Sequence, residues 1–208
     1  MAFTYFFRDL HTLEMIRDKV VPYLRSRRYI HIWDAGCAMG PEPYSLAIML
    51  RENMGSMIFR NVNIHATDID NSSLFGDIIQ KAIYPEEQVK RIPRDIFDKY
   101  FTAAEQDSAA AKDDQFQVID EIRKRIRFQQ HNLLTLQPIR SDLLLIVCKN
   151  VLLHFQPAER VEVIKMFHAA LEDDGYFVTE QTQKLPPEVE HLFEPVVSNA
   201  QLFRKISQ

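Results

Sequence analysis

The spacing of apolar residues changes repeatedly along the chain. Residues 10–24 carry apolar side chains at the three- and four-residue spacing of an amphipathic helix. A short apolar strand at residues 30–33 leads into a run of small residues at 34–40, and a second helical pattern covers residues 44–53. Residues 62–67 then alternate apolar with polar side chains, as a strand does. A strand, a turn, a helix and a second strand in this order predict a parallel sheet covered by helices.

The same alternation of strand and helix patterns returns in the second half of the chain. Residues 126–128 and 142–148 are apolar runs, and the second is continuous enough for the centre of a sheet. Apolar positions from Val161 to Leu171 share one face of a helix, which we expect residues 173–175 to end. Two later strands are predicted at residues 176–179 and 201–206.

The middle of the chain does not follow this alternation of strand and helix patterns. Asn71 and the two serines after it predict the cap of a helix that runs towards Ala82. Charges and alanines dominate from residue 85 onwards, and the stretch 103–114 is too polar to join a core, so we expect it to form a surface loop. The pattern therefore predicts one domain over residues 1–208 with an inserted subdomain at residues 85–127.

Composition narrows the class of protein. The chain has 208 residues, of which 46% are hydrophobic, so it can bury a core and is not a disordered chain. Its 29 acidic residues outnumber its 25 Lys and Arg, which argues against a general nucleic-acid binder. Two cysteines cannot build a disulfide framework, the longest apolar run is too short to span a bilayer, and the N-terminus lacks a secretory signal. We expect a soluble cytoplasmic protein with no nucleic-acid partner and no membrane insertion.

Candidate chemistry begins at the first turn between a strand and a helix. Gly36 and Gly40 would let the backbone approach a nucleotide closely, but neither the dinucleotide pattern nor a P-loop lysine is present. A nucleoside without phosphates is therefore favoured. Asp68, at the end of the second strand, could accept hydrogen bonds from both ribose hydroxyls. It could equally cap the following helix, although Asp70 and Asn71 compete for that position, so the spacing alone leaves both roles open.

Six short motifs, in this order, carry a resemblance to one family. They are Thr4 with Phe6-Phe7-Arg8-Asp9, Ile32-Trp33 with Ala35-Gly36-Cys37-Ala38, residues 42–47, residues 66–70, Asn132-Leu133-Leu134, and residues 148–152. The chain resembles the CheR family of chemotaxis-receptor methyltransferases over residues 4–205. The resemblance implies an α/β, class I (Rossmann-like) methyltransferase fold with a mostly parallel seven-stranded sheet, helices on both faces and a small inserted β subdomain.

The resemblance also implies an activity and a site. Members transfer a methyl group from S-adenosylmethionine, leaving S-adenosylhomocysteine, to glutamate side chains of a protein, which here would be a chemoreceptor or another signalling protein. Glu42 would lie near the amino group of the cofactor, and Asp68 would hold the ribose. Arg8 and His154 are the catalytic candidates. The full set of implied cofactor-binding residues is Thr4, Arg8, Gly36, Cys37, Ala38, Glu42, Asp68, Ile69, Asn132, Leu133, Asn150 and Val151.

The sequence departs from the family pattern in four places. A basic helical domain usually precedes the Phe6-Phe7-Arg8 motif, and we expect this chain to lack it. Residues 39–43 read Met-Gly-Pro-Glu-Pro where the family usually has Thr-Gly-Glu-Glu-Pro. Lys149 replaces an arginine, and His154 replaces a tyrosine. The alternative is therefore a regulatory or interaction module that binds S-adenosylmethionine with weakened catalysis. We expect the two cysteines to be small buried residues, and the seven histidines have no metal-ligand spacing.

Overall fold

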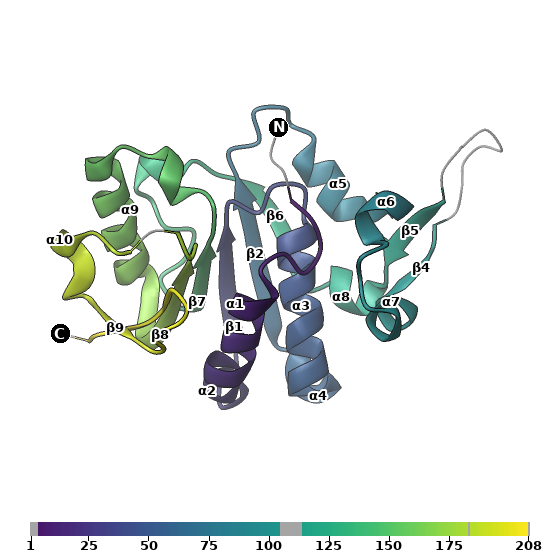
Figure 1. Cartoon of the computed structure of the whole chain (residues 1–208), viewed down its shortest axis with the longest axis horizontal. Helices are drawn as coiled ribbons and strands as arrows, with labels where there is room; N and C mark the ends of the chain where they lie inside the picture. Colours follow the sequence, from purple (N-terminus) through teal and green to yellow (C-terminus); the bar gives the residue numbers. More distant parts are fainter. Residues whose placement is uncertain (1–3, 105–113, 183, 208) are drawn as a thin grey trace.

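A seven-stranded sheet forms the centre of the molecule (Figure 1). The computed structural model describes residues 4–104, 114–182 and 184–207. The strand order is β6-β2-β1-β7-β8-β10-β9. The β8–β10 and β10–β9 pairs are antiparallel, and the other four pairs are parallel. The strands are β1 (Ile30–Ala35), β2 (Val62–Asp68), β6 (Ile126–Gln130), β7 (Leu143–Cys148), β8 (Leu171–Thr179), β9 (Phe193–Pro195) and β10 (Leu202–Lys205). The predicted mostly parallel α/β sheet is thereby confirmed.

Helices cover both faces of this sheet, which is why its central strands are apolar throughout. All six residues of β7 are buried, and successive residues of β1 contribute to two separate cores. Ile32 belongs to the core under the N-terminal helices and α3 (Pro41–Met54), whereas Trp33 belongs to the core under α9 (Pro157–Ala170). A parallel strand buried on both faces is expected to show this continuous apolar character.

The helical segments have the following bounds. They are α1 (Leu10–Met15), a π-helical turn (Ile16–Val20), α2 (Val21–Arg25), α3 (Pro41–Met54), α4 (Ser56–Phe59), α5 (Phe75–Lys81), α6 (Glu86–Val89), α7 (Arg94–Tyr100), α8 (Asp120–Arg123), α9 (Pro157–Ala170) and α10 (Pro187–Glu190), with 3-10 turns at Leu133–Thr135 and Leu152–His154. The predicted helix at residues 10–24 is thus continuous but contains a π-helical turn that ends at Val20, two residues before Pro22. Proline lacks an N–H and its ring collides with the carbonyl four residues earlier, so a wider turn relieves the contact.

Two local predictions were wrong at helix ends. The carboxylate of Asp70 accepts the N–H groups of Leu74 and Phe75, so Asp70, not Asn71 or the serines, caps α5. Helix α9 ends at Ala170, and Leu171 already pairs with Leu143 as the first residue of β8. Residues 173–175 therefore lie within a bulged strand, because pairing with the neighbouring strand outweighed the local helix-ending signal.

A second, smaller sheet lies to one side of the first (Figure 1). Its order is β3-β5-β4, with β3 (Ile83–Pro85) and β4 (Phe101–Ala103) each antiparallel to β5 (Gln115–Val118). The implied small β subdomain is therefore present, although its first strand begins two residues before the predicted boundary at residue 85. Most of the predicted surface loop at 103–114 falls at residues 105–113, outside the described residues.

The N-terminal segment ties the small sheet to the large one. Phe6 is buried and meets Tyr84 of β3 and Phe101 of β4 edge-to-face, at ring-centroid distances of 5.0 and 5.3 Å. The hydroxyl of Tyr84 donates to the carbonyl of Met39, just before α3.

Within the described ranges, no helix has both the length and the apolar character needed to cross a membrane.

Candidate functional site

The candidate site is a cavity of about 560 Å³ at the edge where the parallel strands end. Since these strands run in the same direction, their following loops converge there. All thirteen residues that the sequence analysis singled out line it: Thr4, Arg8, Gly36, Cys37, Ala38, Glu42, Asp68, Ile69, Asn132, Leu133, Asn150, Val151 and His154. The cavity is also lined by Thr67, His131, Lys149, Leu153 and Phe155, which were not predicted as site residues.

The glycine turn forms one wall and requires a residue without a side chain. Gly36 has a φ of +102°, and a Cβ added to it would collide with the side chain of Val151. The N–H groups of Gly36 and Cys37 both donate to the carbonyl of Thr67, at 2.7 and 3.0 Å. The turn is therefore anchored to the end of β2, and its backbone directly faces the loop after β7.

Asp68 holds the glycine turn in place and still faces the cavity. One carboxylate oxygen accepts the N–H of Ala38 at 3.0 Å, and the other accepts the N–H of Asp70 at 3.2 Å. Because Asp70 caps α5, the capping role considered for Asp68 is ruled out. Each carboxylate oxygen can accept more than one hydrogen bond, so Asp68 retains the capacity to bind hydroxyl groups of a ligand.

Polar loops after β6 and β7 complete the cavity. The side-chain oxygen of Asn132 accepts the N–H of Leu134 and so caps the 3-10 turn beside the buried Leu133. Asn150 adopts a left-handed conformation at φ +58°, and its N–H donates to the buried carboxylate of Glu180 at 3.2 Å. His154 is exposed at the rim, and Ile69 is 48% exposed there.

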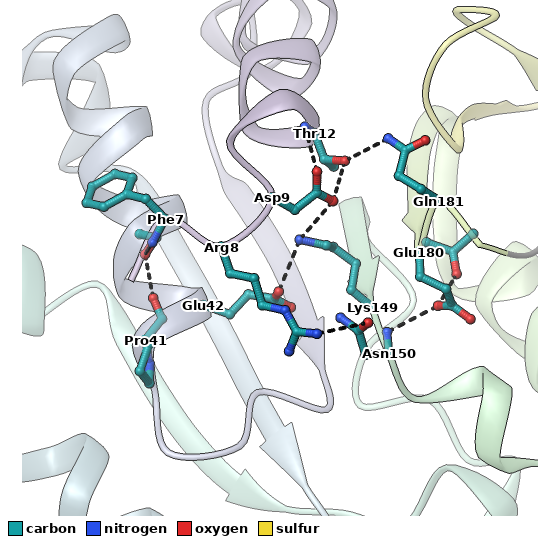
Figure 2. Close-up of polar contacts among 12 residues, drawn as sticks. Phe7, Arg8, Asp9, Thr12, Pro41, Glu42, Lys149, Asn150, Glu180 and Gln181 are labelled. Carbon is teal, nitrogen blue, oxygen red and sulfur yellow. Dashed lines mark hydrogen bonds and ion pairs between the residues drawn. The ribbon is translucent and has the colours of Figure 1, made fainter. Parts of the chain in front are cut away.

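The N-terminal segment is held against the cavity by several contacts (Figure 2). The N–H of Phe7 donates to the hydroxyl of Ser45 at 2.8 Å, and that hydroxyl donates to the carbonyl of Pro41. Arg8 reaches the side-chain oxygen of Asn150 at 3.5 Å. Thr4 and Arg8 therefore form one side of the cavity, although they lie far from its other residues in sequence.

A buried lysine joins this segment to α3. The Lys149 side chain is only 4% exposed, and its Nζ lies 3.3 Å from Glu42 and 3.5 Å from Asp9 (Figure 2). Asp34, at the end of β1, is fully buried close to Glu42, and burial together with that neighbouring carboxyl raises its pKa well above the usual value. Asp9, Asp34 and Lys149 were not predicted as site residues, and their position inside the matching motifs was the available signal.

The two cysteines match the structural expectation. Cys37 and Cys148 are unpaired and buried, and burial raises the pKa of both thiols well above the usual value. Both are therefore poor nucleophiles. Among the described residues, no group of three or more His, Cys, Asp or Glu side chains could hold a metal ion.

Comparison with known proteins identifies relatives over most of the chain. The family model described as "CheR methyltransferase, SAM binding domain" matches residues 2–202. A chemotaxis protein methyltransferase from Borreliella burgdorferi is 32% identical over 84% of this chain, and one from Listeria innocua is 32% identical over 88%. Chemotaxis protein methyltransferase 2 from Pseudomonas aeruginosa is 31% identical over 84%. The chain spans 62%, 65% and 60% of the length of these relatives, respectively.

Proposed function

The chain belongs to the CheR methyltransferase family, in the part that corresponds to its S-adenosylmethionine-binding domain, and on that premise we propose that it methylates a glutamate carboxylate of a partner protein. The methyl donor is S-adenosylmethionine. The acceptor is a chemoreceptor or a related signalling protein in the cytoplasm, where the two unpaired cysteines would remain reduced.

The observation that carries this proposal is the lining of the cavity. The carboxylate of Asp68 can accept hydrogen bonds from hydroxyl groups, and the carboxylate of Glu42 provides a second acidic region. Apolar side chains, such as those of Leu133 and Val151, also line the cavity. A ligand that carries a ribose and a cationic amino-acid part fits this distribution. The volume of about 560 Å³ lies within the range of small-molecule sites.

The reaction requires alignment and exclusion of water more than acid–base chemistry. When bound, S-adenosylmethionine supplies a methyl group activated by a positively charged sulfur. A glutamate acceptor is already ionised at neutral pH, so no residue of the chain has to remove a proton. Val151 and Leu133 exclude water from the reacting atoms, which favours a transition state in which both charges decrease. His154, exposed at the rim, serves to contact the acceptor.

Arg8 is expected to position a ligand and not to stabilise the transition state selectively. A tight pair between its guanidinium and the acceptor carboxylate would stabilise the ground state at least as well, and such binding does not accelerate the reaction. Arg8→Ala should therefore raise KM for acceptor or cofactor more than it lowers kcat, as steady-state kinetics would measure. Arg17→Ala, at an exposed arginine paired with Asp18, is the matched control and should change neither. A collapse of kcat at unchanged KM would contradict the role given to Arg8.

Asp68→Ala should weaken binding of S-adenosylhomocysteine by about 1–3 kcal/mol, the range for a hydrogen bond to a charged group. Isothermal titration calorimetry measures this difference. Asp70→Ala is the matched control, because Asp70 caps α5 and does not line the cavity. The Asp70 variant should lower the free energy of unfolding by about 1 kcal/mol and leave the affinity for S-adenosylhomocysteine unchanged. Equal affinity in the Asp68 variant and the wild type would remove Asp68 from the binding site.

The proposed function itself is tested by following a labelled methyl group. The protein is incubated with S-adenosylmethionine labelled in its methyl group and with membranes that contain a chemoreceptor. We expect label in the receptor that alkali releases as methanol, since a glutamate methyl ester hydrolyses in base. Binding of S-adenosylhomocysteine without transfer to receptors or to any lysate protein would instead support the regulatory module. Failure to bind S-adenosylhomocysteine would exclude both functions.

A further inference from the structure

Glu180 is a buried acidic residue directly after β8. It is 3% exposed and is not among the residues that line the cavity. Cys148 pairs with Thr179, so β7 and β8 end side by side and Glu180 lies next to the loop after β7. Within the described residues, its Oε1 atom has no hydrogen-bond partner. Burying a carboxylate is costly unless its contacts compensate for the loss of water, so the contacts of the other oxygen require an explanation.

The other oxygen of Glu180, Oε2, holds the first turn of the loop after β7. It accepts the backbone N–H of Asn150 at 3.2 Å and the hydroxyl of Thr179 at 2.8 Å. Asn150 has a φ of +58°, in the left-handed region that most residues avoid. A hydrogen bond from a backbone N–H to a carboxylate is stronger than one between neutral groups. The contact with Glu180 therefore helps to keep Asn150 in this conformation.

The turn that Glu180 holds supplies two walls of the cavity. Figure 2 shows Asn150 between Glu180 and Arg8, and the side-chain oxygen of Asn150 lies 3.5 Å from Nη2 of Arg8. The next residue, Val151, lies so close to Gly36 that an added Cβ there would collide with it. Asn150, Val151, Arg8 and Gly36 all line the cavity. A change at Glu180 should therefore reach the cavity through the backbone of Asn150.

We propose that Glu180 is a positioning residue for methyl transfer. By holding the N–H of Asn150, it keeps the Asn150 side chain against Arg8 and so places Arg8 for its ligand. This inference rests on the proposed function and adds a residue outside the cavity to the groups that act in it. The role requires an oxygen acceptor at this position and does not require its negative charge. Glutamine should therefore replace Glu180, and alanine should not.

Steady-state kinetics of methyl transfer test this role. Glu180→Ala should raise KM about fivefold or more for whichever substrate Arg8→Ala affects, and should lower kcat less. Glu180→Gln keeps an acceptor for the N–H of Asn150 and should return KM close to the wild-type value. Glu172→Ala, at an exposed glutamate of the same strand, is the matched control and should change neither constant.

A double-mutant cycle separates positioning from a general loss of stability. If Glu180 acts through Asn150 on Arg8, Glu180→Ala should raise KM little further in a protein that already carries Arg8→Ala. A purely structural role would leave the two effects independent. Urea denaturation shows whether each variant is folded under the assay conditions.

A second variant covers the case in which Glu180→Ala does not fold. Asn150→Gly tolerates the positive φ and removes the oxygen that faces Arg8, so it should raise KM for the same substrate. Unchanged KM in either variant, independent effects in the cycle, or no recovery in Glu180→Gln would overturn the inference while the wild type still transfers methyl groups. Absence of transfer by the wild type would overturn the proposed function and this inference with it.

Discussion

Lys149→Met is expected to destabilise the protein by about 3 kcal/mol and to loosen the N-terminal segment. The variant removes the ion-pair partner of Glu42 and leaves Asp9 and Glu42 facing each other beside the buried Asp34. Breaking a buried ion pair is costly because the remaining charges are no longer compensated. We expect no loss larger than about 3 kcal/mol, since the side chains of Asp9 and Glu42 remain 24% and 16% exposed to solvent.

Urea denaturation measures the loss, and limited proteolysis near the N-terminus reports the loosening. Lys165→Met is the matched control: Lys165 pairs with Glu162 on the surface of α9, and its loss should cost less than about 1 kcal/mol. A penalty equal to that of the Lys165 variant would show that the buried lysine contributes little.

Gly36→Ala is expected to have the second large effect, on both stability and ligand binding. A φ of +102° strains any residue with a Cβ, at a cost of about 1–3 kcal/mol. The added methyl group would also collide with Val151, and overpacking of this kind costs about another 1–3 kcal/mol. Because Gly36 and Val151 both line the cavity, the displacement should reduce affinity for S-adenosylhomocysteine as well.

Two further variants separate strain from collision. Gly55→Ala carries a positive φ of +76° at the end of α3, but its added Cβ meets nothing within 4 Å. It should therefore show only the cost of strain, with unchanged ligand affinity. Gly36→Ala combined with Val151→Ala removes the collision and should recover part of the lost stability and affinity. If Gly36→Ala and Gly55→Ala behave alike in denaturation and calorimetry, close contact across the cavity is not what requires glycine at position 36.

Local patterns predicted elements well where local physics decides them. The apolar run of β7 and the alternation in β2 mark strands whose burial depends on their own side chains. Predictions failed where distant contacts compete with local signals, as at Leu171, which pairs with β7 instead of extending α9. Of the two residues that compete for the start of α5, Asp70 and Asn71, the carboxylate of Asp70 accepts the first N–H groups of the helix.

Motif order and apolar spacing are properties of the chain, so the family, the parallel sheet and the segments around the cavity could be predicted before the fold was known. The balance of charges at that cavity could not. Asp9, Asp34, Glu42 and Lys149 come from four separate segments, and nothing in their spacing indicates that a single buried lysine faces several carboxyl groups. Electrostatic energies in a buried site depend on distance and exposure to water, and both are set only when the chain has folded.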